Sequence, residues 1–327
     1  MTINGLVGCC SSPKKYPWSE LKVVDMSRIR GPLQLTLVLV LSLGIRTQAA
    51  ELIGTVTDSA TGRAIPARVY VQSSAGEWLF VNSAAIEGNA LPYREQWVPM
   101  PHAVEKHTTI SAHPFCIDLQ PGEYTITIER GKEYHPLSRK ITIGSSPQQE
   151  AFALRRWINL SELGWYSGET HVHRRIHELP NVQLAEDLNV SFPVTFWTTE
   201  AYKVPTTAPS PLRRQGPSPF GPREDRGQKM IEIDGSHVIF PRNTEYEVFS
   251  VNGKAHTLGV LSVLNHQSVF NRGIPPVKAI AAQVHREGGL IDLEKHSWPW
   301  SMMIIPVAKV DLYELSNNSV WRTSFGS

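Results

Sequence analysis

The spacing of apolar residues changes near residue 160, and this change limits the chain to two successive kinds of fold. Before it, short segments such as Ile53-Gly-Thr-Val-Thr57 and Ala67-Arg-Val-Tyr-Val71 alternate apolar and polar residues, with the two-residue period of a half-buried strand. After it, strand-like segments alternate with helix-like ones. Because 327 residues leave room for about two domains, we predict a multidomain protein with a β domain over 51–155 and an α/β domain over 160–327.

Turn residues separate the strand-like segments of the first domain. Asp58-Ser-Ala-Thr-Gly62 follows the first strand, and Pro121-Gly122 lies between two later ones. This pattern predicts an antiparallel β-sandwich. Residues 54–71 with Pro121-Gly-Glu-Tyr124 resemble the carboxypeptidase regulatory-like domains, which implies a transthyretin-like sandwich with an accessory role. His107 falls in a loop-like stretch, so we expect it at the surface.

The second domain shows the pattern of an α/β fold. A helix with proline in its first turn is predicted over 180–188, and Asn252-Gly253 predicts a tight hairpin between two strands. A second helix over 275–287 is closed by Gly288-Gly289. The predicted strands cover residues 165–173, 191–199, 245–251, 256–264, 290–296 and 309–315.

Two histidines in the first of these strands carry the main chemical signal. His171 and His173 are two residues apart, so in a strand both imidazoles point to one face and can bind one ion. Histidine mixed with carboxylates suits zinc, manganese or iron, and carboxylates can bridge two ions. The alternative is that these histidines are unrelated surface or hydrogen-bonded residues.

Three ordered motifs carry a resemblance to a known superfamily. They are Gly168-Glu-Thr-His-Val-His173, then Asn243-Thr-Glu-Tyr-Glu247 with His256-Thr-Leu-Gly259, then Gly288-Gly-Leu-Ile-Asp-Leu-Glu-Lys-His296. They resemble the polymerase-and-histidinol-phosphatase (PHP) superfamily, and within it the CehA/McbA metallohydrolases, which cleave an aryl carbamate or an amide. The resemblance implies a distorted (β/α) barrel that binds one to three divalent ions (Zn, Mn or Fe).

The resemblance also assigns roles to individual residues. Glu200 stands where many members have a histidine, His177 is a candidate for a ligand shortly after the opening pair, and Glu169 is a candidate for orienting an imidazole. The metal ligands that match the family motifs are His171, His173, Glu245, His256 and His296.

The roles of three further acidic residues have two interpretations each. Glu247 shares a strand face with Glu245 and either joins the site or forms an ion pair. Asp292 and Glu294 alternate with apolar residues, so in a regular strand they share the face of His296. They either face the site or form salt bridges with neighbouring basic residues.

These residues together predict a metal-dependent hydrolase of a small-molecule amide, carbamate or ester. A bound divalent ion activates water, so no nucleophilic serine or cysteine is required. A phosphoesterase on the same site is one alternative. A secreted glycan- or protein-binding protein with a vestigial metal site is another. Nothing in the charge pattern indicates a nucleic-acid partner, and the oligomeric state is left open.

The amino-terminal segment predicts export. Met26-Ser-Arg-Ile-Arg30 precedes an apolar run over 33–45, and Thr47-Gln48-Ala49 resembles a cleavage site, so 26–50 fits a signal peptide. Residues 1–25 then reflect a misassigned start. Since residues 1–50 hold six of the 32 basic and two of the 30 acidic residues, the remainder carries a charge of about −2. We expect a periplasmic or extracellular protein with no integral membrane segment after cleavage.

The carboxyl-terminal segment departs from the superfamily pattern. That pattern ends with an acid-x-His motif, whereas no histidine follows His296. Residues 160–327 are also fewer than the roughly 250 of a complete barrel. We therefore expect a truncated barrel domain that binds metal weakly or not at all.

Overall fold

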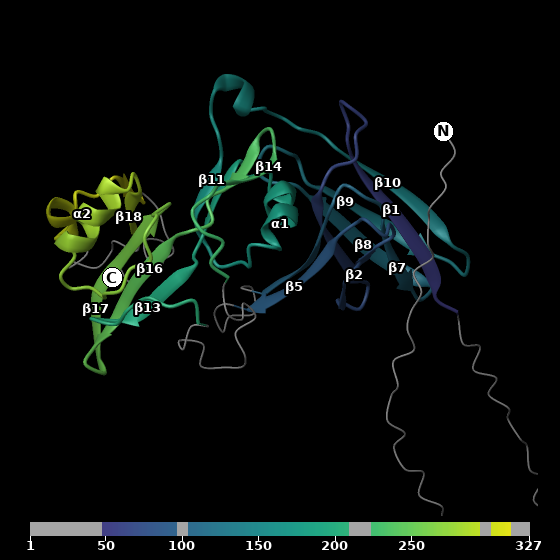
Figure 1. Cartoon of the computed structure of the whole chain (residues 1–327). Coiled ribbons are helices and arrows are strands. Elements are labelled where there is room, and N and C mark those ends of the chain that lie inside the picture. Colours follow the sequence, from purple (N-terminus) through teal and green to yellow (C-terminus); the bar gives the residue numbers. More distant parts are fainter. Residues whose placement is uncertain (1–47, 97–103, 209–223, 295–301, 315–327) are drawn as a thin grey trace, which may run out of the picture.

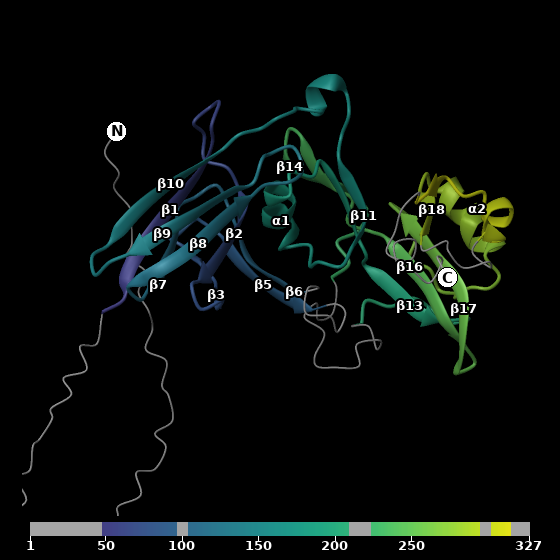
Figure 2. The ribbon, with the colours of Figure 1, turned by 180° about the vertical axis from the view of Figure 1, so that it is seen from behind.

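The computed structural model describes two β-rich parts that lie side by side, with the helix α1 (Leu179–Ala185) between them (Figure 1). Strands from 50–154 form the first part and strands from 168–313 form the second, and Figure 2 shows the same arrangement from behind. The predicted segment 1–25 and most of the predicted signal peptide lie outside the described residues. The described residues are 48–96, 104–208, 224–294 and 302–314.

Two sheets make up the first part. One has the strand order β10-β1-β7-β4, and the other has the order β5-β6-β2-β8-β9, with β3 paired to β2. The strands of the first sheet are β1 (Ala50–Asp58), β4 (Asn82–Ser83), β7 (Phe115–Leu119) and β10 (Gln148–Leu154). Those of the second are β2 (Ala67–Ser73), β3 (Trp78–Leu79), β5 (Ala90–Gln96), β6 (Val104–Ile110), β8 (Gly122–Glu129) and β9 (Leu137–Ile143).

An apolar core joins these two sheets. Buried and less buried residues alternate strictly along β1, so every second side chain points inward. Leu52 and Phe152 from one sheet and Ile126 from the other are fully buried in the same cluster. Two sheets that share one apolar core agree with the predicted β-sandwich, although β1 and β10 run parallel rather than antiparallel.

The position predicted for His107 is wrong. The residue lies on β6 rather than in a loop, and it is only 4% exposed. Its ring stacks on Tyr93 of β5 at 5.3 Å and contacts Tyr70 of β2 at 5.2 Å. The sequence does not show that β2 and β5 lie beside β6, because cross-strand contacts depend on the pairing of distant segments.

The second part also contains two sheets. One has the order β11-β12-β15-β14, and the other has the order β13-β16-β17-β18-β19. The strands of the first are β11 (Gly168–Val172), β12 (Val190–Pro193), β14 (Ile231–Asp234) and β15 (His237–Ile239). Those of the second are β13 (Phe196–Glu200), β16 (Thr244–Val251), β17 (Lys254–Leu264), β18 (Leu290–Glu294) and β19 (Leu312–Tyr313).

The chain passes directly from one of these sheets to the other between β12 and β13. The single strand predicted over 191–199 is in fact β12 followed by β13, interrupted at Val194 and Thr195. Pro193 has no N–H to donate to a neighbouring strand. The Thr195 hydroxyl donates to the carbonyl of Pro241, and the regular strand is interrupted here. This break turns the chain from one sheet into the other at the place where β11 ends.

The sheet that contains β16 has two different faces. Tyr246, Leu261 and Ile291 on one face form an apolar cluster with the helix α2 (Lys278–Arg286). Residues one position along on the same strands, which include Glu245, Ser262 and Asp292, lie on the opposite face. The apolar contacts with α2 therefore determine that the acidic residues point away from that helix.

Several predicted elements of the second part are present. The hairpin between β16 and β17 turns at Asn252 and Gly253, with φ of 51° and 72° as a type I′ turn requires. The other helices in the described part of the chain are short: α1 (Leu179–Ala185), α4 (Ile304–Ala308) and the 3₁₀ turn η2 (Ser161–Leu163). The parallel pairs β11–β12 and β13–β16 fit the α/β prediction, but the described strands show no closed barrel.

No helix in the described ranges combines the length and apolar character needed to cross a bilayer.

Candidate metal centre

The end of β11 brings the two predicted histidines together. His171 is the fourth residue of the strand and His173 follows it, so both imidazoles project from the same side of the chain. Their Nε2 atoms lie 2.7 Å apart, with ring centroids separated by 4.7 Å. Trp197 of β13 packs edge-on against the His173 ring at 5.0 Å, which restricts its rotation.

Glu245 of β16 completes a group of three potential ligands. Its side chain is fully buried, and its two oxygens lie 3.3 Å from His171 Nε2 and 3.5 Å from His173 Nε2. The three ligand atoms all lie within 4.8 Å of one another. Two imidazoles and one carboxylate form a donor set used for divalent transition metals. This group can hold a metal ion.

Glu294 of β18 stands directly behind His171. One of its oxygens contacts His171 Nδ1, and its side chain is 1% exposed. A carboxylate that accepts a hydrogen bond from Nδ1 fixes the ring orientation and leaves Nε2 to face a metal ion. Glu294 therefore lies beside the histidine pair and contacts it, whereas its basic neighbour Lys295 lies outside the described residues.

A row of buried polar residues continues the site across the sheet. Strand pairing places Glu245 opposite Ser262 and Ser262 opposite Asp292. Asp292 is 2% exposed, and the other oxygen of Glu294 is fully buried as well. Among the described residues, Ser262 Oγ, Asp292 Oδ1 and Glu294 Oε1 have no hydrogen-bond partner. Buried oxygens of this kind fit a cation or a water held by one.

The electrostatics of the group favour a bound positive charge. Burial works against the charged form of His171, yet Glu245 and Glu294 raise its pKa well above the usual value. Burial and then the charge of Glu294 raise the pKa of Asp292 to about 6. Both shifts have one cause, an excess of carboxylates in a buried place, and a divalent cation would relieve it.

Three other predicted residues are not among the potential ligands of this group. Glu169 accepts a hydrogen bond from the backbone N–H of His171 at 3.0 Å, so it holds the strand rather than the imidazole. The His177 side chain is 60% exposed, and its nearest acidic partner is Glu178 at 3.9 Å. Glu200 lies at the end of β13 opposite Ser250 and is not part of the three-residue group.

Two further ligands implied by the resemblance, His256 and His296, have side chains outside the described residues. His256 belongs to β17, but its side chain lies outside the described residues, and so does the whole of His296. Glu247 is 6% exposed and shares the face of Glu245, since it pairs with Val260 opposite Glu294. It lies outside the three-residue group.

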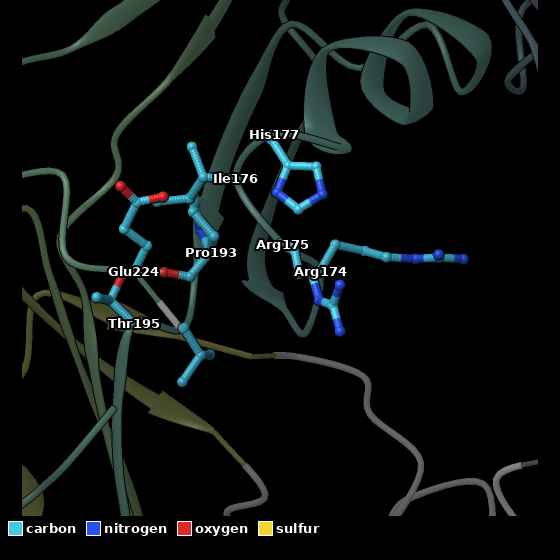
Figure 3. A pocket seen from close by; sticks show the side chains of 8 residues that line it. Arg174, Arg175, Ile176, His177, Pro193, Thr195 and Glu224 are labelled. Carbon is cyan, nitrogen blue, oxygen red and sulfur yellow. Dashed lines mark hydrogen bonds between the residues drawn. The ribbon is translucent and has the colours of Figure 1, made fainter. Parts of the chain in front are cut away.

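A pocket of about 320 Å³ opens at the loop that follows His173 (Figure 3). The loop lies at the carboxyl ends of the parallel strands β11 and β12, where ligands bind in many α/β folds. Both polar and apolar side chains line the pocket, so an organic molecule with polar groups fits it better than a purely apolar one. The lining residues are Arg174, Arg175, Ile176, His177, Pro193, Val194, Thr195 and Glu224.

The sequence gives no sign that Trp197 contacts the site, and it leaves two interpretations open for Glu294. The alternation of β18 was the available signal for Glu294, because acidic residues at 292 and 294 alternate there with apolar ones. No local signal was available for Trp197. Its contact with His173 joins two strands that belong to different sheets.

Comparisons with known proteins leave the family open. No family model matches the chain, and no curated protein matches it in sequence. The Bacillus anthracis TIE protein is similar in structure over 33% of this chain and 17% of its own, with 15% identity and a TM-score of 0.22. The group B streptococcus pilus 2b backbone protein is similar over 36% and 43%, with 14% identity and a TM-score of 0.24. This chain therefore spans less than half of either structure.

Proposed function

We propose that the chain is a metal-dependent hydrolase of small molecules, and that its ion is held by His171, His173 and Glu245. The observation that carries the proposal is the convergence of these three side chains from two different sheets onto ligand atoms within 4.8 Å. The motifs that end at His173, Glu247 and His296 resemble the PHP superfamily, and this supports the same chemistry.

Each residue of the group has a definable role. His171 and His173 offer Nε2 atoms, and Glu245 offers one oxygen towards each ring. Glu294 holds His171 in the orientation that exposes Nε2. When bound, a divalent ion supplies Lewis-acid activation of water and of the scissile group. Asp292, buried beside Glu294, can accept or return a proton close to the ligand group.

The pocket beside His173 suggests the kind of substrate. Its volume of about 320 Å³ suits a small organic molecule, and it begins one residue after the second histidine. Amide, carbamate and ester hydrolysis are the proposed reactions. Phosphate ester hydrolysis uses the same activation of water, so the test must separate the two.

The test measures metal content and hydrolysis on the same full chain. The sequence alone predicts weak binding or none, but three potential ligands lie together. We therefore expect about one or more equivalents of Zn or Mn at saturating metal, and hydrolysis of at least one chromogenic ester, amide or carbamate. His171→Ala should abolish both. His135→Ala is the matched control, since this exposed histidine lies in the sandwich and should leave both unchanged. A chain that binds neither ion at saturating concentration would contradict the proposal, and cleavage of only the phosphate substrate would assign the phosphoesterase alternative.

A further inference from the structure

The strand β11, which contains His171 and ends one residue before His173, is weakly held by its own sheet. β11 is the outer strand in the order β11-β12-β15-β14 of the described residues, so it is paired on one side only. Its register with β12 is irregular between Glu169 and Val172, the stretch that includes His171. Edge strands with interrupted pairing open more readily than central ones. The position of His171 and His173 must therefore depend on contacts outside this sheet.

The β-sandwich supplies such contacts through α1. Asn181 Nδ2 donates to the Thr109 carbonyl of β6 at 3.0 Å, and Arg130 donates to the Leu184 carbonyl at 2.5 Å. Arg130 also pairs with Asp187 at 2.5 Å, and both side chains are less than 10% exposed. These bonds connect the sandwich to the helix that follows the histidine pair, so one end of the loop 173–178 is anchored on the first domain.

A second sandwich contact reaches the residue next to His173. The guanidinium of Arg174 lies over the ring of Tyr93 at 4.1 Å from its centroid, in cation–π geometry. Figure 3 shows the Arg174 side chain extending away from Pro193 and Thr195, on the other side of the pocket. Tyr93 is itself 8% exposed and is stacked on His107, so its ring is a firm support.

His107, which stacks on Tyr93, does not disturb the contact between Tyr93 and Arg174. Burial, and then the charges of Arg68 and Arg174, lower the pKa of His107 to about 3. His107 therefore stays neutral at ordinary pH and does not repel the Arg174 guanidinium. Glu178, 3.8 Å from Arg174, adds a negative charge beside the same guanidinium.

We infer that Tyr93 is a positioning residue for the metal centre and acts by holding Arg174, and through it the end of β11. The inference rests on the proposed metal site. It gives the sandwich a specific role, because the first domain then fixes the loop that sets the distance between His173 and Glu245.

The test compares three variants of the full chain in Co²⁺ binding, read from the visible absorption spectrum and from competition with a chelating dye. Tyr93→Leu keeps apolar bulk but removes the aromatic face, and we expect about tenfold weaker binding with an altered spectrum. Tyr93→Phe keeps the face and should bind within about twofold of the unmodified chain. Arg174→Met removes the cation and should reproduce the effect of Tyr93→Leu.

The double variant separates positioning from general damage. If Tyr93 acts through Arg174, Tyr93→Leu with Arg174→Met should bind Co²⁺ no more weakly than either single variant. If Tyr93→Leu fails to fold, Arg174→Met alone carries the test. Normal affinity and spectrum in Arg174→Met would overturn the inference and leave the proposed metal site intact. Absence of Co²⁺ binding by the unmodified chain would overturn both.

Discussion

Two histidines, His107 in the first part of the molecule and His171 in the second, have pKa values that are shifted in opposite directions. His107 in the sandwich is surrounded by aromatic rings and lies near Arg68 and Arg174, and its pKa falls to about 3. His171 lies between two carboxylates, and its pKa rises well above the usual value although burial opposes this.

The difference lies in what surrounds each ring. Burial alone disfavours an imidazolium, so a lowered pKa is what a structural core histidine shows. A raised pKa requires negative charges that are themselves buried, and such charges are retained where they bind something positive. The surroundings of His107 are those of a structural core. The face of β16–β18 that contains Glu245 and Glu294 has the buried negative charge expected of a cation-binding site.

The largest expected effect is on the stability of the β-sandwich. Phe152 is fully buried in the core of the sandwich and stacks on Phe115 at 6.1 Å. Phe152→Ala leaves a cavity and should lower the free energy of unfolding by about 3–5 kcal/mol, measured by urea denaturation. Under conditions where the variant is folded, its metal affinity should be unchanged. A large loss of metal affinity would show that the sandwich and the metal centre are coupled through the sandwich core as well as through the loop 173–178.

The next effect concerns the site. Removing a group that only supports a ligand typically weakens metal binding about 10- to 100-fold. Glu245→Gln alters a ligand of the group itself, so we expect a loss of more than about 100-fold, measured by dye competition. The chain should fold as before, because glutamine has nearly the same shape. Retained affinity would exclude Glu245 as a ligand.

The third effect is the acid response of the sandwich. The folded state resists protonation of His107 down to about pH 3, whereas the unfolded chain takes up the proton near pH 6.5. Stability is therefore lost as pH falls through this window, by about 1.4 kcal/mol per unit. His107→Phe should reduce the loss between pH 6.5 and 4.5 by about 2–3 kcal/mol. Unchanged pH dependence of unfolding would mean that His107 is not buried in the neutral form.

The smallest effect has the opposite sign and belongs to the site. The pKa of Asp292 is raised to about 6, so the metal-free chain loses stability as pH rises from about 4 to 6. Asp292→Asn should stabilise the metal-free chain by about 1–3 kcal/mol at pH 8 and by nothing near pH 3, measured by thermal unfolding. Destabilisation at pH 8 would indicate that this carboxylate already has a positively charged partner.

Local pattern predicted much of the fold. The alternation in β1 and β2, the Asn252-Gly253 turn and the helix that contains Ile280 and Val284 all appear as expected. These features depend on neighbours within a few residues, so one sequence suffices to predict them. The break at Val194 and Thr195 was not predicted, since it follows from a hydrogen bond to the distant Pro241.

The sequence by itself determined that His171 and His173 share one side of a strand and that acidic residues recur on β16 and β18. Only the tertiary structure decided which of these acids meet the histidines. Glu245 and Glu294 come from strands separated by β17 in the sheet, and α2 covers the face they avoid. Periodicity tells which residues share a face, whereas packing of the opposite face decides what that face meets.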